Sequence, residues 1–188
     1  MKSPSRLRVS AGELRGRRLR VPAGARPSSA LLREALFSIW GERVRGAAVL
    51  DLFAGSGAVG IEALSRGAER AVFVERERAA LSALAWNLEL VEPRSARVVR
   101  GGVIEALTDG SLAGESFDLL FADPPYAVEL GSEFYSALRS FARPGAWLAV
   151  ERRAEPARED LHASGWRLAD SRRYGDSTLS LFELAGDD

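Results

Sequence analysis

Hydrophobic and polar residues alternate along the chain with two different periods, and each period predicts a different kind of element. Residues 6–21 place apolar and basic side chains in turn around Ala11-Gly12, which is the two-residue period of a two-stranded ribbon. The face of this ribbon opposite its arginines is expected to carry Leu7, Val9, Leu19 and Val21. Ser28–Trp40 instead repeats its apolar residues at helical spacing behind a serine N-cap, which predicts a helix packed on the main sheet.

Strand-like and helix-like segments then alternate from residue 47 to residue 151. The expected strands are Ala47–Phe53, Ala71–Glu75, Ala96–Arg100, Phe117–Ala122 and Ala146–Glu151. The expected helices are Ala58–Arg66, Arg78–Val91, Val103–Leu107 and Gly131–Phe141. This alternation predicts an α/β fold in which helices cover both faces of a mostly parallel sheet.

The last part of the chain has a different pattern. Trp166–Arg173 and Thr178–Leu184 are two strand-like runs joined by Tyr-Gly-Asp-Ser, with no room for a crossover helix between them. They should therefore pair as an antiparallel hairpin. A mostly parallel, seven-stranded sheet that ends in such a hairpin is the Rossmann-like fold of class I methyltransferases, here with a small basic β-ribbon added at the N-terminus.

Length and composition restrict what this fold can hold. With 188 residues and 46% hydrophobic content, the chain supports one substantial core, so we expect a ribbon over residues 1–27 and a single domain over residues 28–188. No apolar run reaches the roughly 18 residues of a membrane-spanning helix, and the basic N-terminus lacks the apolar part of a secretory signal, so we expect a soluble, cytoplasmic protein. The absence of cysteine and the single histidine, His162, exclude disulfides, thiolate nucleophiles and a multi-histidine metal site.

Positive charge is concentrated at the N-terminus. Residues 1–26 hold eight basic side chains and one acid, Glu13, a net charge of 8 − 1 = +7 that leaves −7 elsewhere because the whole chain is neutral. Clustered cations bind nucleic acid because they release its condensed counterions. On charge alone, a solvated tail is an equally good interpretation.

Residues 49–60 indicate a cofactor site, because an apolar strand runs there into a glycine-rich turn and then a helix. The G-x-G-x-x-G match at 55–60 is also a dinucleotide fingerprint and is weak by itself. Asp51 separates the two possibilities, since an acid before the loop repels a pyrophosphate but suits the ammonium of a methionine moiety. Glu75 ends the next strand, where it can accept ribose hydroxyls. The sequence thus favours S-adenosylmethionine, with the predicted contacts Asp51, Phe53, Ala54, Gly55, Ser56, Gly57, Glu75, Arg76, Gly102 and Val103.

A second loop, Asp123-Pro124-Pro125-Tyr126, follows the strand Phe117–Ala122 and should lie on the same rim. The lone pair of a base amino nitrogen is delocalised into the ring, so a catalyst must draw its N–H bonds out of plane. We assign this role to the Asp123 carboxylate and the Pro124 carbonyl, and we assign stacking of an extruded base to Tyr126. The sulfonium methyl is already activated, so an in-line displacement needs no metal. A rigid Pro-Pro turn with a buried tyrosine is the alternative interpretation.

The motifs resemble those of the RsmD family, the 16S ribosomal RNA guanine N2 methyltransferases. The resemblance spans nearly the whole chain and is carried by residues 15–19, 26–28, 33–37, 50–57, 60–68, 73–75 and 123–126, together with Glu151 and Tyr174-Gly175. The run Glu-Ala-Leu-Ser-Arg-Gly-Ala at 62–68 is much more specific than either loop. The resemblance implies a guanine N2 target, guanine 966 in the family, in 16S rRNA of an assembling or assembled small ribosomal subunit.

The resemblance also implies that the ribbon helps to bind this RNA. The expected substrate contacts are Arg15, Arg17, Arg18, Pro125 and Tyr126, and we expect a monomer with no membrane partner. Two departures stand out: Ser28-Ser29-Ala30-Leu31 replaces the family's Thr-x-Asp-Arg, and the third strand ends without the acid that many methyltransferases place near the adenine. Backbone atoms of Gly102 and Val103 would then substitute.

Three other functions remain open: an adenine N6 methyltransferase acting on DNA, an inactive rRNA-binding assembly factor and, more remotely, a dinucleotide-dependent oxidoreductase. Asn87 is expected to have a local packing or hydrogen-bonding role and His162 to lie on the surface. The four tryptophans should fill the core or its rim. Glu151 is explained equally well by substrate contact and by loop organisation.

Overall fold

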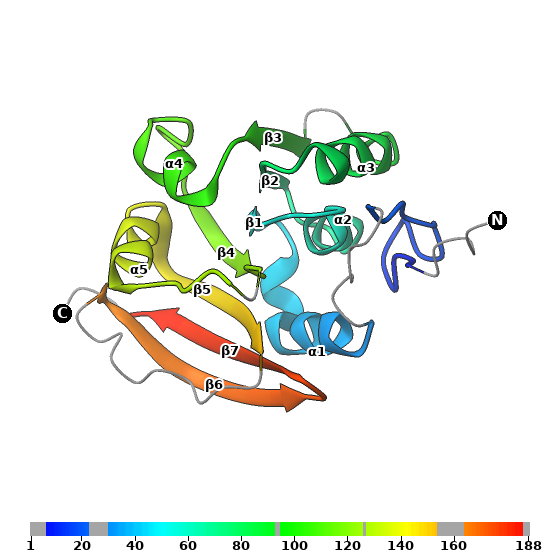
Figure 1. Ribbon diagram of the computed structural model, residues 1–188. Coiled ribbons are helices and arrows are strands. Elements are labelled where there is room, and N and C mark those ends of the chain that lie inside the picture. Colours follow the sequence, from blue (N-terminus) through cyan, green and yellow to red (C-terminus); the bar gives the residue numbers. More distant parts are fainter. Residues whose placement is uncertain (1–6, 23–29, 93–94, 126, 154–163, 186–188) are drawn as a thin grey trace.

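The computed structural model describes residues 7–22, 30–92, 95–125, 127–153 and 164–185, and within them seven strands form one sheet (Figure 1). The strands are β1 (Ala48–Leu52), β2 (Arg70–Glu75), β3 (Ala96–Arg100), β4 (Phe117–Ala122), β5 (Ala142–Arg153), β6 (Trp166–Tyr174) and β7 (Ser177–Leu184). The helices are α1 (Ala30–Trp40), the 3-10 turn η1 (Gly41–Val44), α2 (Ala58–Ser65), α3 (Arg78–Leu88), α4 (Val103–Thr108) and α5 (Ser132–Arg139).

The strand order is β3-β2-β1-β4-β5-β7-β6. The first five strands are parallel, and β7 runs antiparallel to both β5 and β6. The order reverses between β1 and β4, which is where open α/β sheets bind their ligands. The predicted Rossmann-like fold, with its terminal hairpin, is therefore confirmed.

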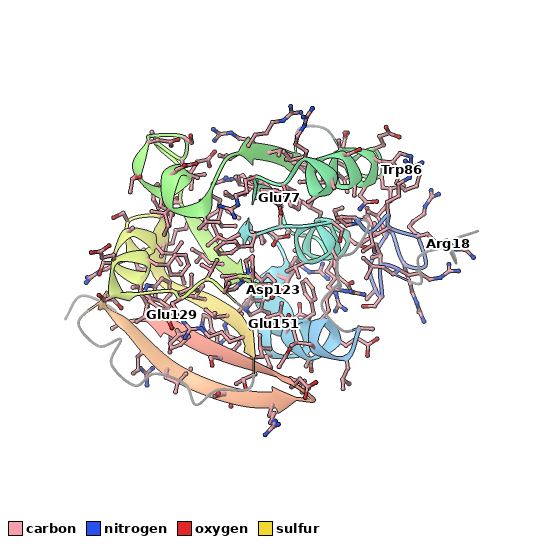
Figure 2. The ribbon with its side chains drawn as sticks, viewed as in Figure 1. Arg18, Glu77, Trp86, Asp123, Glu129 and Glu151 are labelled. Atoms are coloured by element: carbon pink, nitrogen blue, oxygen red, sulfur yellow. The ribbon has the colours of Figure 1, made fainter. Side chains whose placement is uncertain are left out.

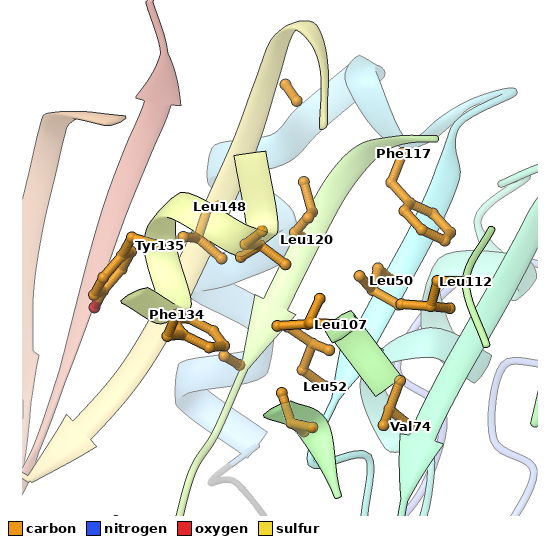
Figure 3. Close-up of a cluster of buried hydrophobic side chains, with 14 of the residues drawn as sticks. Leu50, Leu52, Val74, Leu107, Leu112, Phe117, Leu120, Phe134, Tyr135 and Leu148 are labelled. Atoms are coloured by element: carbon orange, nitrogen blue, oxygen red, sulfur yellow. The ribbon is translucent and has the colours of Figure 1, made fainter. Parts of the chain in front are cut away.

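Alternate residues of each strand enter two separate cores on the two faces of the sheet. Leu50 and Leu52 of β1 pack with α4 and α5, in the cluster drawn in Figure 3. Val49, which precedes Leu50 and points to the opposite face, packs there with α1, α2 and α3. Because both faces are covered, β1 is buried along its whole length and reads as a continuous apolar run apart from Asp51.

Most elements occur where the sequence predicts them, with two informative differences. β5 begins at Ala142 rather than Ala146, because Ala142 pairs with Phe117 before the register shifts and Trp147 pairs with Leu119. The irregular stretch between these pairs includes Gly145 at φ 75°, so a bulge hides the first part of the strand from a simple alternation pattern. α3 ends at Leu88 instead of Val91, and the Ser28 cap lies outside the described residues.

The N-terminal segment, which we call the arm (residues 7–22), has the predicted alternation but a different centre. Arg8 bridges Arg18 in antiparallel fashion, so the turn is centred on Glu13 and the prediction of Ala11-Gly12 is wrong. Gly12 serves another purpose, since a Cβ on it would lie 1.7 Å from the carbonyl oxygen of Ser65 in α2. A glycine that allows close approach resembles a turn glycine in sequence. The apolar side chains buried by the arm against the core are Leu7, Val9 and Leu19.

Candidate active site

A cavity of about 320 Å³ opens at the carboxyl ends of the parallel strands, close to the point where the strand order reverses. Its size falls within the roughly 300–1,000 Å³ of small-molecule sites. The residues that line it are Phe53, Val74, Glu75, Arg76, Glu77, Gly101, Gly102, Val103, Ile104, Glu105, Asp123, Pro125, Val128, Glu129 and Leu130. Both predicted loops therefore contribute to one cavity.

The glycine-rich loop after β1 is shaped by close packing as well as by its turn. Gly55 and Gly57 have φ angles of 56° and 75°, which favour glycine. A Cβ on Gly57 would lie 2.4 Å from Leu84 Cδ1, and one on Gly60 would lie 2.3 Å from Phe73 Cε1. The glycine spacing thus lets α2 lie directly on β2 and α3.

Phe53 is the one non-glycine among the described residues with a positive φ, at 59°. It directly follows β1 and lines the cavity. Non-glycine residues held in the left-handed region cluster at ligand sites, because the surrounding structure must compensate for the strain. This conformation turns the chain sharply at the end of β1, in agreement with a binding loop.

Glu75, on the neighbouring strand, fixes the loop between β1 and α2, residues 53–57, which we call the cofactor loop. Its Oε2 accepts a hydrogen bond from Gly55 N at 2.8 Å, and its Oε1 accepts hydrogen bonds from Arg76 N and Glu77 N, each at 2.7 Å. One carboxylate therefore holds both the β1–α2 loop and the β2–α3 turn while it lines the cavity. Ribose hydroxyls entering here would share or replace these donors.

Asp51 lies deeper than the sequence suggests. Its side chain is buried, its Oδ2 accepts a hydrogen bond from Gly60 N at 3.0 Å, and it is absent from the residues that line the cavity. Burial raises the pKa of Asp51 to about 8; the Gly60 hydrogen bond opposes this rise, and the charges of Asp123 and Glu75 add to it. The contact of Asp51 with a methionine ammonium stays a prediction.

Asp51, Glu75 and Asp123 lie in one region, since the charges of Glu75 and Asp123 both raise the pKa of Asp51. The negative charge of this region determines which ligands it can bind. Glu77, Glu105 and Glu129 add further acids to the lining, against one base, Arg76. Such a wall repels the diphosphate of a dinucleotide and attracts a cation. A dinucleotide cofactor therefore fits this cavity poorly, and a sulfonium with an ammonium fits it well.

The second loop places Asp123 at the edge of the same cavity. Asp123 is half-buried and Pro125 exposed, and both line the cavity, whereas Pro124 is buried; Tyr126 lies outside the described residues. On the neighbouring strand, Val150 pairs with Ala122, which brings Glu151 beside Asp123 (Figure 2). Glu151 Oε1 accepts a hydrogen bond from Ser177 Oγ at 2.9 Å and so ties β5 to the hairpin.

The far wall of the cavity is formed by the turn before α4. Gly101 N donates to Glu75 O at 3.0 Å, and Gly102 N donates to Glu105 Oε2, also at 3.0 Å. Gly102 and Val103 line the cavity, and the neighbouring Ile104 is 56% exposed. The exposed Ile104 side chain is thus available to an adenine ring at this wall, where the Gly101 and Gly102 N–H groups already have acceptors.

The predicted RNA-contacting arginines lie outside the cavity. Arg15, Arg17 and Arg18 are exposed on the arm, and none of them forms an ion pair with another described residue. Figure 2 shows Arg18 at the outer edge of the molecule, with Asp123 near its centre. These cations are available to an external anionic partner.

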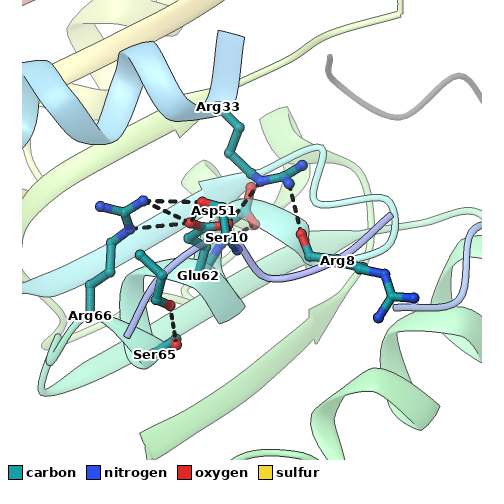
Figure 4. Close-up of polar contacts among 9 residues, drawn as sticks. Arg8, Ser10, Arg33, Asp51, Glu62, Ser65 and Arg66 are labelled. Atoms are coloured by element: carbon teal, nitrogen blue, oxygen red, sulfur yellow. Dashed lines mark hydrogen bonds and ion pairs between the residues drawn. The ribbon is translucent and has the colours of Figure 1, made fainter. Parts of the chain in front are cut away.

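A buried polar cluster, which we call the Glu62 cluster (Ser10, Arg33, Glu62 and Arg66), fastens the arm to the domain (Figure 4). Glu62 accepts hydrogen bonds from Arg33 Nε and Arg66 Nη2, each at 2.9 Å, and from Ser10 N at 3.2 Å. Burial raises the pKa of Glu62, but the hydrogen bonds from Ser10 and Arg66 and the charge of Arg33 hold it below its ordinary value. Glu62 and Arg66, the two ends of the Glu-Ala-Leu-Ser-Arg run, thus both contribute to the attachment of the arm.

Asn87 is the residue that sequence reasoning undervalued. It is fully buried on α3 and hydrogen-bonds to Ser56 of the cofactor loop and to the backbone of Arg20 in the arm. A local role was expected, but its partners lie 31 and 67 residues away. A polar residue at a buried helical position was the available signal, and only the fold supplies the partners.

The four tryptophans lie in the core or at its rim, as the sequence predicts. Trp40 and Trp166 are fully buried, whereas Trp86 and Trp147 lie at the rim under Arg20 and Arg43. The described residues contain no group of acids and histidines that could hold a metal ion. Over the same residues, no helix has the length and apolar character needed to cross a membrane. His162 lies outside the described residues.

Comparison with known proteins agrees with this geometry. A family model described as "Conserved hypothetical protein 95" matches residues 7–183. Ribosomal RNA small subunit methyltransferase D of Escherichia coli is 37% identical over 158 residues, which cover 80% of this chain and 76% of that protein. The Haemophilus influenzae protein of the same name is 30% identical over 183 residues, covering 94% and 93%.

Solved structures show the same relationship. The putative methyltransferase YhhF of Escherichia coli superimposes with a TM-score of 0.83 and 33% identity, over 96% of this chain and 99% of that chain. Thermus thermophilus RsmC, a 16S rRNA N2 G1207 methyltransferase in complex with AdoMet and guanosine, gives a TM-score of 0.68 and 28% identity over 86% of this chain and 44% of that one. Because the family model and the relatives extend over most of its length, the chain belongs to the RsmD family of ribosomal RNA small subunit methyltransferases.

Proposed function

We propose that this protein transfers a methyl group from S-adenosylmethionine to the exocyclic N2 of a guanine in 16S rRNA of the small ribosomal subunit. The observation that carries the proposal is that Asp123 and Pro125 line the same cavity as Phe53 and Glu75. A cofactor held by the first loop would then present its methyl group to an amino group held by the second.

The cofactor assignment rests on the charge of the cavity lining and on similarity to related structures. The acid-lined cavity suits a cationic ligand, and a related structure was solved with AdoMet. We assign the ribose to Glu75 and the loop backbone from Phe53 to Gly57, the adenine to Gly102 and Val103, and the remaining cofactor contacts to Asp51 and Arg76. The bound cofactor supplies a methyl group already activated by its sulfonium.

The chemistry of the transfer then needs positioning and one acceptor. The Asp123 carboxylate and the Pro124 carbonyl each accept a hydrogen bond from one N–H of the guanine amino group. This arrangement directs the nitrogen lone pair toward the methyl carbon. The N–C bond forms as the C–S bond breaks, S-adenosylhomocysteine leaves, and the excess proton on nitrogen passes to Asp123 or to water. Tyr126 stacks the extruded base.

The choice of guanine N2 in 16S rRNA, and of guanine 966 within it, follows the family. Residues 1–27, which include the arm, are proposed as the RNA-binding part and residues 28–188 as the catalytic domain. The exposed Arg15, Arg17 and Arg18 would contact phosphates and so position the subunit, assembling or assembled, while Pro125 and Tyr126 contact the base.

The test is transfer of radiolabelled methyl from S-adenosylmethionine to small-subunit particles that lack the modification, with naked DNA in parallel. N2-methylguanosine in the digested RNA supports the proposal. N6-methyladenosine in the DNA would support the adenine-directed alternative, because an Asp-Pro-Pro-Tyr loop offers the same acceptors to either amino group. Cofactor binding without any transfer would favour an inactive assembly factor.

A further inference from the structure

Asn87 joins the arm to the cofactor loop through its side chain alone. Its Oδ1 accepts a hydrogen bond from Arg20 N at 2.7 Å, and its Nδ2 donates to Arg20 O at 3.0 Å and to Ser56 O at 2.8 Å. An amide group has two N–H donors, so one holds the arm and the other holds the loop. Both donors of a fully buried side chain are thereby satisfied.

The contact with Arg20 resembles the pairing between two strands. The Asn87 amide meets both backbone groups of Arg20, as a neighbouring peptide group would. The Arg20 guanidinium also lies 4.0 Å from the ring centroid of Trp86, the residue before Asn87 on α3. The last part of the arm is therefore held to α3 by both the backbone and the side chain of Arg20.

The contact with Ser56 reaches the centre of the cofactor loop. Ser56 lies between Gly55 and Gly57, the two glycines whose backbone requires a positive φ. Gly55 N is held by Glu75 from β2, and Ser56 O is held by Asn87 from α3. The loop is thus fixed at two adjacent residues, from the cavity side and from the arm side.

We infer that Asn87 is a positioning residue that couples the arm to the cofactor loop. Binding of cofactor orders the loop, fixes the Ser56 carbonyl and so stabilises the arm through the Asn87 amide; an arm held by RNA stabilises the loop in return. Such coupling is reciprocal, so each ligand raises the affinity for the other by the same factor. The RNA half of this inference rests on the proposed function, whereas the cofactor half does not.

The first test needs no RNA. Amide hydrogen exchange is followed in the full-length protein with and without S-adenosylhomocysteine, at the arm amides Val9, Gly16 and Leu19, which are hydrogen-bonded within the arm. We expect the ligand to slow their exchange several-fold in the natural protein but not in Asn87→Ala. Unchanged arm exchange in the natural protein, or full protection in Asn87→Ala, would overturn the coupling.

Leu88→Ala provides the matched control. Leu88 is partly buried against the same core and is the next residue of α3, but its side chain makes no hydrogen bond to the arm or the loop. A loss of helix packing alone should leave the protection in place. If Asn87→Ala does not fold, Asn87→Asp keeps the acceptor for Arg20 N but removes both N–H donors, to Arg20 O and to Ser56 O, and it should lose protection in the same way.

The second test measures reciprocity with RNA. The dissociation constant of S-adenosylhomocysteine is measured with and without a saturating small-subunit rRNA transcript. We expect RNA to tighten binding at least fivefold in the natural protein and in Leu88→Ala, and less than twofold in Asn87→Ala, whose KM for cofactor should rise far more than its kcat falls. If the arm amides are protected by the ligand but no N2-methylguanosine is formed, the proposed function alone is contradicted. If N2-methylguanosine is formed but RNA does not change the affinity for S-adenosylhomocysteine, the coupling alone is contradicted.

Discussion

Asp123 is the residue on which the proposed chemistry most depends. Asp123→Asn replaces an acceptor with a group that also donates, so the guanine amino group loses its orientation. We expect kcat to fall by about 10²–10³, the loss typical of removing one transition-state hydrogen-bonding group, while affinity for S-adenosylhomocysteine changes less than threefold. Radiolabelled methyl transfer and calorimetric titration measure the two quantities.

Asp109→Asn is the control for this substitution, because Asp109 is an exposed acid just after α4 and away from the cavity lining. It should leave kcat within twofold of the natural value. Turnover of Asp123→Asn equal to that of the control would remove Asp123 from the mechanism.

The raised pKa of Asp51 predicts that cofactor affinity depends on pH, and it sets the direction of that dependence. With its pKa raised to about 8, the free protein keeps this carboxyl protonated at neutral pH, and a cationic ligand favours the ionised form. Binding of S-adenosylmethionine should therefore release a proton, and affinity should rise between pH 6 and pH 8. Calorimetry in buffers of different ionisation enthalpy measures this release.

The raised pKa of Asp51 also makes the stability of the folded protein depend on pH, and this stability falls as pH rises. The folded protein binds a proton that the unfolded chain, with the pKa at its ordinary 3.8, has lost, so this group's contribution favours unfolding as pH rises from about 4 to 8. Asp51→Asn should remove both effects. The variant should release no proton on binding, and between pH 4 and pH 8 the Tm of the natural protein should fall relative to that of the variant. Persistence of the proton release in Asp51→Asn would assign it to another group.

At the scale of elements, α2 depends on the absence of side chains where it crosses β2. Gly60→Ala would place a methyl group 2.3 Å from Phe73 Cε1 in a buried, closely packed region. We expect a loss of about 1–3 kcal/mol in the free energy of unfolding, as for other overpacked cores. Chemical denaturation of the variant and the natural protein gives this value.

Gly131→Ala is the matched control, since nothing lies within 4 Å of a Cβ at Gly131 and its φ is not positive. Because Gly131 is the N-cap of α5, where glycine is preferred to alanine, the stability of this variant should fall by less than about 1 kcal/mol. Equal stability of the two variants would mean that α2 adjusts its position without cost.

The elements themselves were largely predictable, for physical reasons. Buried parallel strands read as continuous apolar runs, and glycine-rich turns mark where such strands end. The start of β5 was missed because the bulge before Trp147 interrupts its alternation. The centre of the arm was misplaced because Gly12 serves close packing against Ser65, and no local pattern distinguishes that use from a turn.

At the scale of the molecule, the arm supplies a basic surface distant from the chemistry. Exchanging Arg15, Arg17 and Arg18 for glutamate should weaken RNA association with little change in Tm, because all three are exposed. Each phosphate contact to single-stranded RNA contributes about 0.7 to the slope of log affinity against log salt, so the slope should fall by roughly 2. Filter binding over a salt series measures it, and an unchanged slope would remove these arginines from the RNA interface.

The candidate site was predictable only in part, and the division follows sequence distance. Phe53, Glu75 and Asp123 adjoin strand ends, so the rule that ligands bind at the carboxyl edge of the sheet was enough to group them. Apart from the i, i+4 pair of Glu62 and Arg66, the Glu62 cluster and the Asn87 link bring together residues 29 to 67 positions apart. A single sequence contains no spacing rule for such contacts, because they depend on how α1, α2 and α3 pack.

Methyl transfer to small-subunit particles that lack the modification, followed by nucleoside analysis of the RNA, tests the central claim most directly. The proposed function predicts labelled N2-methylguanosine with the natural protein and almost none with Asp123→Asn. Label in any other nucleoside, or equal N2-methylguanosine from both proteins, would contradict it.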